Sequence, residues 1–185
     1  DQYRPATLNR LTAALDKQGK VTGWQHAIAG PSIMTRVFPN AVKNGLDNTS
    51  VEGAANLAYA IPSMQVTWVM ENGAVPVGFW RSVGSSQNAY ITECFLDELA
   101  AAAGKDPYEY RRALLARQPR HLGVLELAAR KAGWGTPLPV GRTRGIAVAE
   151  AFGSYCAQVA EVSVERGQVR VQRVVCAIDC GLVVN

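Results

Sequence analysis

The sequence predicts an α+β fold in which mixed sheet hairpins pack with three to four helices. Strand-like alternation dominates both ends of the chain and helical spacing dominates its middle, with no internal repeat. The composition is that of an ordinary globular protein, with 48% hydrophobic and 18% charged residues. The 185 residues are enough for one or two small domains with a buried core.

The N-terminal strands are predicted to form a β-hairpin over residues 8–29. Leu11, Ala13 and Leu15 alternate with polar neighbours, and a polar turn follows before the second strand. His26 lies in that second strand. We expect it to be structural, because a lone histidine in a strand is more often structural than catalytic.

The next segment, residues 30–48, contains prolines, glycines and asparagines without sustained periodicity. It predicts an irregular connection of a kind that is often functional or mobile. Ser50 is expected to cap a short helix that runs to Tyr59. Residues 64–70 then alternate as a strand.

Three longer helices are predicted between residues 86 and 133. The first begins at Ser86 or Asn88 and ends at Gly104. We expect its apolar stripe to lie in the core and its acids to be solvated, as on most amphipathic helices. The stripe comprises Ile91, Cys94, Phe95, Leu99 and Ala102, and the acids are Glu93, Asp97 and Glu98.

The second helix has a strong start signal. Asp106 can cap it, Pro107 takes the first helical position, and Glu109 completes a capping box. The third helix follows a break at Pro119 and ends at Gly133. Both helices are expected to pack against the core.

A linker rich in proline and glycine, residues 135–142, is the best internal boundary in the sequence. We therefore expect one part over residues 1–137, with the first strands and the helices, and a β-rich part over residues 138–185. Strands of the second part are predicted at residues 145–148, 156–164 and 169–178. The last two are joined by a hairpin turn.

Charge and hydropathy exclude several classes of function. The formal net charge is +4, from 19 basic and 15 acidic residues that are largely scattered, so nucleic-acid binding is not predicted. No apolar run approaches the roughly 20 residues that cross a bilayer, and no signal-peptide pattern is present.

The four cysteines form no Cys-x-x-Cys pair, so a zinc site is not expected. Cys176 and Cys180 lie four residues apart on one predicted strand, so their side chains project from the same face. Four strand residues rise roughly 13 Å, which is too far for a disulfide. We expect all four cysteines to be small buried residues.

The strongest candidate for a ligand-binding site is residues 78–88, where two aromatic residues precede Arg81 and a loop of small residues. Small residues let a ligand approach the backbone, and the following helix offers unpaired N–H groups to an anion. Arg81 adds a planar, permanently charged donor group. The stretch is interpreted as an anion or cofactor clamp, although by spacing alone such an arginine is more often a solvated cap.

A second candidate is the loop at residues 150–155, where Glu150 and Phe152 lie beside a glycine. A carboxylate near an aromatic wall can perform acid–base chemistry. More often such a carboxylate caps a turn. The sequence leaves both interpretations open.

Three motifs carry a resemblance to a known family. They are Arg81-Ser82-Val83-Gly84-Ser85-Ser86-Gln87 with the helix after it, Arg144-Gly145-Ile146-Ala147-Val148, and the run from Val174 to Asn185. Together they resemble the molybdenum-binding large subunit of the xanthine oxidase family, nearest to isoquinoline 1-oxidoreductase beta subunits and their aldehyde-oxidising relatives. The similarity covers nearly the whole chain and only a segment of such a subunit, so the implied fold is a segment of a molybdopterin-binding domain.

The resemblance implies hydroxylation of an aldehyde, or of the carbon beside nitrogen in an aromatic heterocycle, with water as the oxygen source. It implies a molybdenum–molybdopterin cofactor in the parent protein and iron–sulfur clusters on a small partner subunit. The rest of the large subunit is a further implied partner. The bacterial periplasm is favoured, with the cytoplasm as the alternative.

The family's functional positions carry over onto several residues. Arg81 matches the arginine beside the cofactor, and Gly84 and Gln87 match the loop that surrounds it. Val83 takes a substrate-lining position that is a phenylalanine in xanthine oxidoreductases, which implies a roomier or differently shaped pocket. Phe152 is a further substrate-lining candidate.

Two family motifs are missing from the sequence. They are the Gly-Gln-Gly type loop that binds the pterin and the Gly-x-Gly-Glu run with the catalytic glutamate. No catalytic residue and no metal ligand is therefore assigned within this chain. We expect a fragment, truncated at its C-terminal end, that in isolation neither retains cofactor nor turns over substrate. The alternative is a stand-alone α+β binding or interaction module without catalysis.

Overall fold

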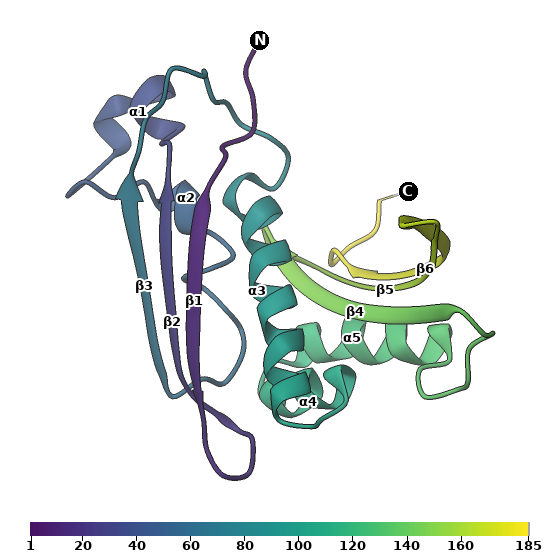
Figure 1. The fold of residues 1–185 in the computed structure, drawn as a ribbon. Coiled ribbons are helices and arrows are strands. Elements are labelled where there is room, and N and C mark those ends of the chain that lie inside the picture. Colours follow the sequence, from purple (N-terminus) through teal and green to yellow (C-terminus); the bar gives the residue numbers. More distant parts are fainter. Residues whose placement is uncertain (185) are drawn as a thin grey trace. The chain divides into compact units, whose positions relative to one another are not determined.

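The computed structural model describes residues 1–184, which divide into two compact units (Figure 1). The first unit contains residues 1–57 and 61–103, and the second contains residues 58–60 and the chain from 104 onward. The linker at residues 135–142 therefore lies inside the second unit. Each unit has one three-stranded sheet with helices, which confirms the α+β class.

The elements of the first unit are β1 (Leu8–Leu15), β2 (Val21–Gly30), α1 (Met34–Val37), α2 (Asn48–Val51), β3 (Ser63–Met70) and α3 (Val83–Ala102), with a 3-10 turn at Pro39–Ala41. Those of the second unit are α4 (Pro107–Leu114), α5 (Pro119–Ala132), β4 (Arg142–Ala151), β5 (Ser154–Glu165) and β6 (Gln168–Asp179). The described residues thus form five α-helices. The additional helix, α1, is four residues long and lies in the segment predicted as irregular.

The sheet of the first unit is mixed. β1 and β2 form an antiparallel hairpin, and β3 joins the other edge of β2 in parallel. The Asp16 carboxylate closes the hairpin turn by accepting from the backbone N–H groups of Gln18 and Lys20, both at 2.9 Å. His26 is fully buried in β2 and bonds Asn9 across the hairpin at 2.8 Å, as its structural role predicts.

Helix α3 buries a different face from the predicted one. Of the expected stripe, Leu99 is buried, whereas Cys94 and Ala102 are exposed. The buried residues are largely small or polar, and they are Gly84, Ser85, Asn88, Thr92, Glu93, Leu96, Leu99 and Ala100. The expectation that Glu93 is solvated is therefore wrong, because it shares a helical face with Leu96 and Ala100 and is only 5% exposed.

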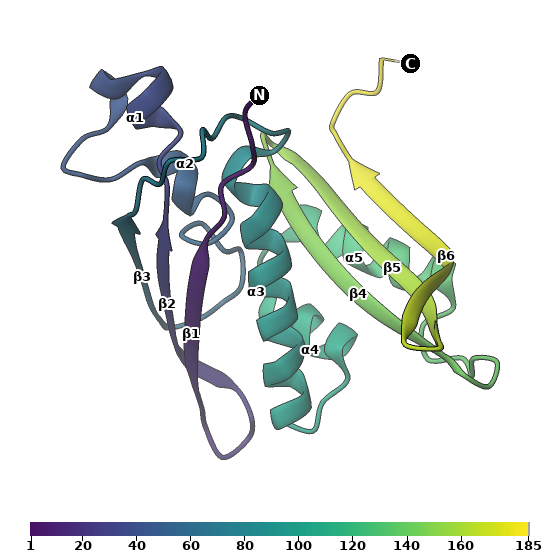
Figure 2. The ribbon, with the colours of Figure 1, turned by 45° about the horizontal axis from the view of Figure 1, so that its top comes forward.

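The sheet of the second unit is antiparallel, in the order β4-β5-β6, and α5 packs against one of its faces (Figures 1 and 2). Ala157 and Val159 of β5 and Ala177 of β6 are buried. Both hairpins turn on two residues with positive φ, as the primed turns require. The pairs are Phe152-Gly153 and Arg166-Gly167.

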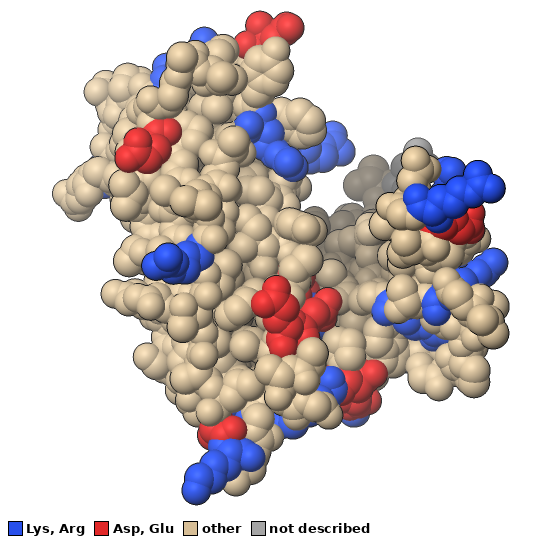
Figure 3. All heavy atoms as spheres, in the orientation of Figure 1, with Lys and Arg blue, Asp and Glu red and all other residues tan. Residues whose placement is uncertain are grey.

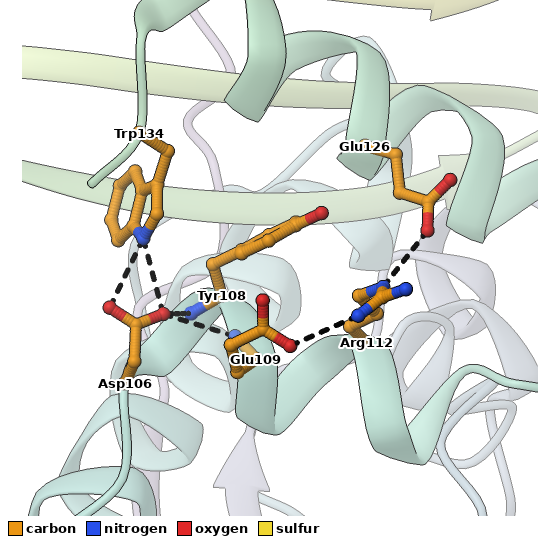
Figure 4. Close-up of polar contacts among 6 residues, drawn as sticks. All are labelled: Asp106, Tyr108, Glu109, Arg112, Glu126 and Trp134. Atoms are coloured by element: carbon orange, nitrogen blue, oxygen red, sulfur yellow. Dashed lines mark hydrogen bonds and ion pairs between the residues drawn. The ribbon is translucent and has the colours of Figure 1, made fainter. Parts of the chain in front are cut away.

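A polar cluster joins the start of α4 to the end of α5 (Figure 4). Asp106 accepts from two backbone N–H groups of the first turn of α4 and from Trp134 Nε1, which lies 3.1 Å from both carboxylate oxygens. Arg112 bridges Glu109, at 3.2 Å, and Glu126, at 3.0 Å. The predicted cap is confirmed, while Glu109 takes part in an ion pair across one helical turn.

The expectation that all four cysteines are buried is wrong. Cys94, Cys176 and Cys180 are exposed and Cys156 is half-buried. Strand alternation explains Cys156 and Cys176, since their buried neighbours Ala157 and Ala177 have the opposite parity.

Charge is distributed without a large patch of one sign on the face that Figure 3 shows, where basic and acidic side chains are interspersed. Across residues 1–184, no helix has both the length and the apolar character of a membrane crossing. No group of three or more histidine, cysteine, aspartate or glutamate side chains in that range is placed to hold a metal ion.

Candidate functional site

The loop before α3 is strained. Ser82 has φ 66° and Val83 has φ 45°, although neither residue is glycine. A β-branched residue at positive φ is a genuine outlier, and such conformations cost on the order of 1–3 kcal/mol each. A hydrogen bond of 3.0 Å from the Val83 N–H to the Trp80 carbonyl closes the loop. Strain of this kind concentrates at ligand sites.

Helix α3 begins at Val83, earlier than the predicted caps at Ser86 and Asn88. Its N-terminus has no side-chain cap and no acid in the first turn. Ser86 instead donates its hydroxyl to the Arg81 carbonyl at 2.7 Å, which ties the loop to the helix. The positive end of the helix dipole is therefore not neutralised by a carboxylate in the first turn.

Arg81 is exposed directly beside this helix start. Within residues 1–184, its guanidinium has no hydrogen-bond or ion-pair partner. The neighbouring Trp80 is 57% exposed, and the Arg4 guanidinium lies 5.8 Å from its ring centroid. The loop thus offers an unpaired planar cation and an exposed aromatic surface to a ligand.

Gly84 sets the position of this loop through helix packing. It is buried, and a Cβ at this residue would collide with the Thr49 carbonyl oxygen and lie 3.2 Å from Glu52. One turn later, Asn88 donates to the carbonyls of Ser50, at 3.1 Å, and Glu52, at 2.8 Å. Gly84 and Asn88 together hold α3 closely against α2.

Gln87 is half-buried in the first turns of α3. Its buried Oε1 has no hydrogen-bond partner among the described residues, and the same holds for Asn88 Oδ1. Unsatisfied buried acceptors are rare in folded proteins. Once the side chain turns toward the surface, an N–H donor on a bound ligand can satisfy the Gln87 oxygen.

The structure brings together four of the predicted site residues in one place. Arg81, Val83, Gly84 and Gln87 lie in the loop and the first turns of α3, all in the first unit. Phe152 lies in the second unit, at the tip of the β4–β5 hairpin, where it is 75% exposed.

The loop around Phe152 has the geometry of a capped turn. Gly153 N–H donates to Glu150 Oε1 at 3.0 Å, so the carboxylate caps the hairpin. Phe152 itself has φ 52°, an unfavourable conformation that projects its ring at the tip. This arrangement favours the capping interpretation of Glu150 over acid–base chemistry.

Asp47 is the main anchor of the first unit that sequence patterns did not find. It is 1% exposed and caps α2, where Ser50 was expected. It accepts hydrogen bonds from Ser32 Oγ and Thr49 Oγ1, both at 2.6 Å, and from the Met34 N–H at 3.1 Å. Burial acts to raise the pKa of Asp47, but these hydrogen bonds outweigh it and lower the pKa.

A charged cluster in the second unit is internally paired. Arg120 donates to both oxygens of Asp179, at 2.7 and 2.8 Å, and its guanidinium lies 4.2 Å from the Tyr155 ring centroid. The bond to Arg120 lowers the pKa of Asp179 to about 2. His121 packs edge-on against the same tyrosine at 4.7 Å. This ion pair joins α5 to β6. Because its charges neutralise each other, the cluster offers no free charge to a ligand.

Comparisons with known proteins identify a family. Residues 1–115 match the family model of the molybdopterin cofactor-binding domain. The chain is 28% identical to the beta subunit of the isoquinoline 1-oxidoreductase of Brevundimonas diminuta, over 98% of this chain and 24% of that protein. It is 36% identical to one subunit of the nicotinate dehydrogenase of Pseudomonas putida, over 69% of this chain and 12% of that protein.

Among solved structures, the aldehyde oxidoreductase of Desulfovibrio gigas has the same fold. The TM-score is 0.52 at 18% sequence identity, over 92% of this chain and 21% of that one. The chain therefore spans about a quarter or less of the length of each of these three proteins.

Proposed function

Because the chain belongs to the family of molybdopterin cofactor-binding domains, we propose that it forms one segment of the large subunit of a molybdenum hydroxylase. Two of its relatives are named as single subunits of their enzymes, which supports assembly with other polypeptides. The small share of their length that it matches supports a cofactor site completed by further polypeptide. Alone, the chain is then expected to hold no cofactor.

The unpaired Arg81 beside the uncapped start of α3 is the observation that carries this proposal. A molybdenum–molybdopterin cofactor is anionic, and a cation next to a helix N-terminus suits an anion. The unsatisfied Gln87 Oε1 suits an N–H donor of the pterin. The residues present therefore fit this group.

Each residue has a separate part in the proposal. Arg81 binds the anionic portion of the cofactor, and Gln87 accepts a hydrogen bond from it. Gly84 positions both by holding α3 against α2. Val83, held at φ 45° between them, faces the substrate, and its small side chain leaves room there. Phe152, in the second unit, stays a prediction as a substrate-lining residue.

When bound, the cofactor supplies the oxidation of an aldehyde or an N-heterocyclic aromatic, with water as the oxygen source. This chain orients the cofactor through Arg81 and Gln87. The glutamate that acts as a base, and the iron–sulfur clusters that take up electrons, belong by this proposal to parts outside this chain.

A substitution series in the subunit that contains this segment tests the proposal. Arg81→Ala is expected to lower the molybdenum content per polypeptide by about tenfold or more, since a hydrogen bond to a charged group contributes about 1.5–3 kcal/mol. Arg81→Lys keeps the charge and is expected to lose less. Arg10→Ala removes an exposed arginine of β1 and serves as the control. Equal molybdenum contents in all three variants would contradict a role for Arg81.

The isolated chain provides a second test. Expressed in a host that makes the cofactor, it is expected to carry no molybdenum and to oxidise neither aldehydes nor N-heterocycles. Molybdenum bound in a fixed ratio to the isolated chain, or turnover by it, would show that the site is complete within these residues.

A further inference from the structure

Two cysteines of the second unit lie together across a pair of strands. Cys156 Sγ on β5 is 3.5 Å from Cys176 Sγ on β6. In the register of the sheet, Cys156 pairs with Ile178 and Gln158 pairs with Cys176, so the two cysteines are diagonal neighbours. Both are free thiols.

The pair lies on a face of the sheet that solvent reaches. Ala157 and Ala177, which are buried, have the opposite parity and lie on the other face. Cys176 is exposed and Cys156 is half-buried. The amide of Gln158 lies 3.7 Å from Cys176 Sγ. A small molecule can therefore reach Cys176 first and Cys156 after it.

The distance suits a disulfide that opens and closes. A disulfide bond is about 2.05 Å long, so the sulfurs must approach by about 1.5 Å through side-chain rotation and strand adjustment. Burial, together with the neighbouring Cys176, raises the pKa of Cys156 to about 11, so this thiol is protonated near neutral pH and must lose its proton before it can attack.

We propose that Cys156 and Cys176 form a redox-active dithiol that exchanges with small disulfides of the glutathione type. The Cys176 thiolate attacks one sulfur of the small disulfide, whose S–S bond breaks and releases one small thiolate. Cys156 then loses its proton to solvent and attacks Cys176 Sγ, which releases the second small thiol. Two protein thiols are oxidised and one small disulfide is reduced.

Cys180 is badly placed to compete with Cys156 for Cys176. Cys180 follows Cys176 by four residues, a rise of roughly 13 Å along an extended strand. The pair lies wholly within the second unit and includes none of the residues proposed to bind the cofactor or the substrate.

The test is an equilibration of the folded chain with mixtures of oxidised and reduced glutathione. Remaining thiols are blocked with N-ethylmaleimide, and intact mass and peptide mapping identify the products. The expected product has lost two hydrogen atoms, carries no glutathione, and contains the peptides of Cys156 and Cys176 linked together. A wild-type product that stays as a glutathione adduct on Cys176 would overturn the proposal.

Variants separate the pair from general thiol reactivity. Cys156→Ser is expected to accumulate the Cys176–glutathione adduct, because the resolving thiol is gone. The double variant Cys94→Ser/Cys180→Ser is expected to form the internal disulfide as the wild type does. An internal disulfide in Cys156→Ser, or its loss from the double variant, would show that other cysteines pair. Circular dichroism of each variant confirms folding, and the wild-type product map stands if a variant fails to fold.

Discussion

Gly84 lacks a side chain because α3 and α2 approach each other closely at this residue. We predict that Gly84→Ala lowers the free energy of unfolding by about 1–3 kcal/mol, since the added Cβ meets the backbone carbonyl of Thr49 and a backbone atom gives way poorly. Urea denaturation measures the change.

Gly123 provides the matched control, because it lies inside α5 with nothing within 4 Å of an added Cβ. Gly123→Ala is expected to raise the free energy of unfolding by up to about 1 kcal/mol through helix propensity. If Gly84→Ala were as well tolerated, the close α2–α3 contact would not exist in solution.

His26 makes the stability of the first unit depend on pH. Burial lowers its pKa from 6.5 to about 4, and its Nδ1 has no hydrogen-bond partner among the described residues. Between pH 6.5 and about 4, His26 is largely protonated in the unfolded chain and largely neutral in the folded chain. The free energy of unfolding is therefore predicted to fall from pH 6.5 to about 4, by about 3 kcal/mol at 1.36 kcal/mol per pKa unit.

Urea denaturation at a series of pH values measures this dependence, and NMR assigns it. The His26 ring resonances are expected to titrate near pH 4. A midpoint near 6.5 for His26 would contradict its burial. His121, whose pKa burial also lowers, contributes a dependence of the same sign, so the assignment of the two histidines is part of the measurement.

At the scale of elements, Asp106 connects the two helices of the second unit. We predict that Asp106→Ala lowers the free energy of unfolding by about 1–2 kcal/mol, because α4 loses its N-cap and Trp134 Nε1 loses its acceptor. Asp106→Asn keeps a side-chain oxygen at the cap and is expected to lose less. Equal losses in the two variants would show that charge, and not capping, is what matters there.

Local signals predicted most elements, and long-range contacts account for what they missed. The Pro107 and Pro119 starts and the Gly133 end came directly from capping and turn chemistry. The parallel pairing of β3 with β2, and the packing of α3 on α2, join residues far apart in sequence. A single sequence has no local pattern for such contacts.

The candidate site shows the same division. Arg81 and the small residues after it were recognisable from residue type and from family resemblance. The positive φ of Val83 was not, because the sequence has a β-branched residue where such a backbone predicts glycine. The proximity of Cys156 and Cys176 depends on the register between β5 and β6. The alternation of side chains along one strand shows which residues share a face, and it does not show which residues of a second strand lie beside them.

At the scale of the whole molecule, the family model matches residues 1–115, which contain the first unit and the beginning of the second. The features that suit a cofactor lie in this region. We propose that these residues supply the Arg81 loop to a molybdenum site in a larger subunit.

The most direct test is the molybdenum-to-polypeptide ratio of the native protein, captured from its source cells with an antibody raised against this chain. We predict about one molybdenum per captured polypeptide, on a polypeptide several times larger than this chain. A captured polypeptide with the mass of this chain and no molybdenum would contradict the account.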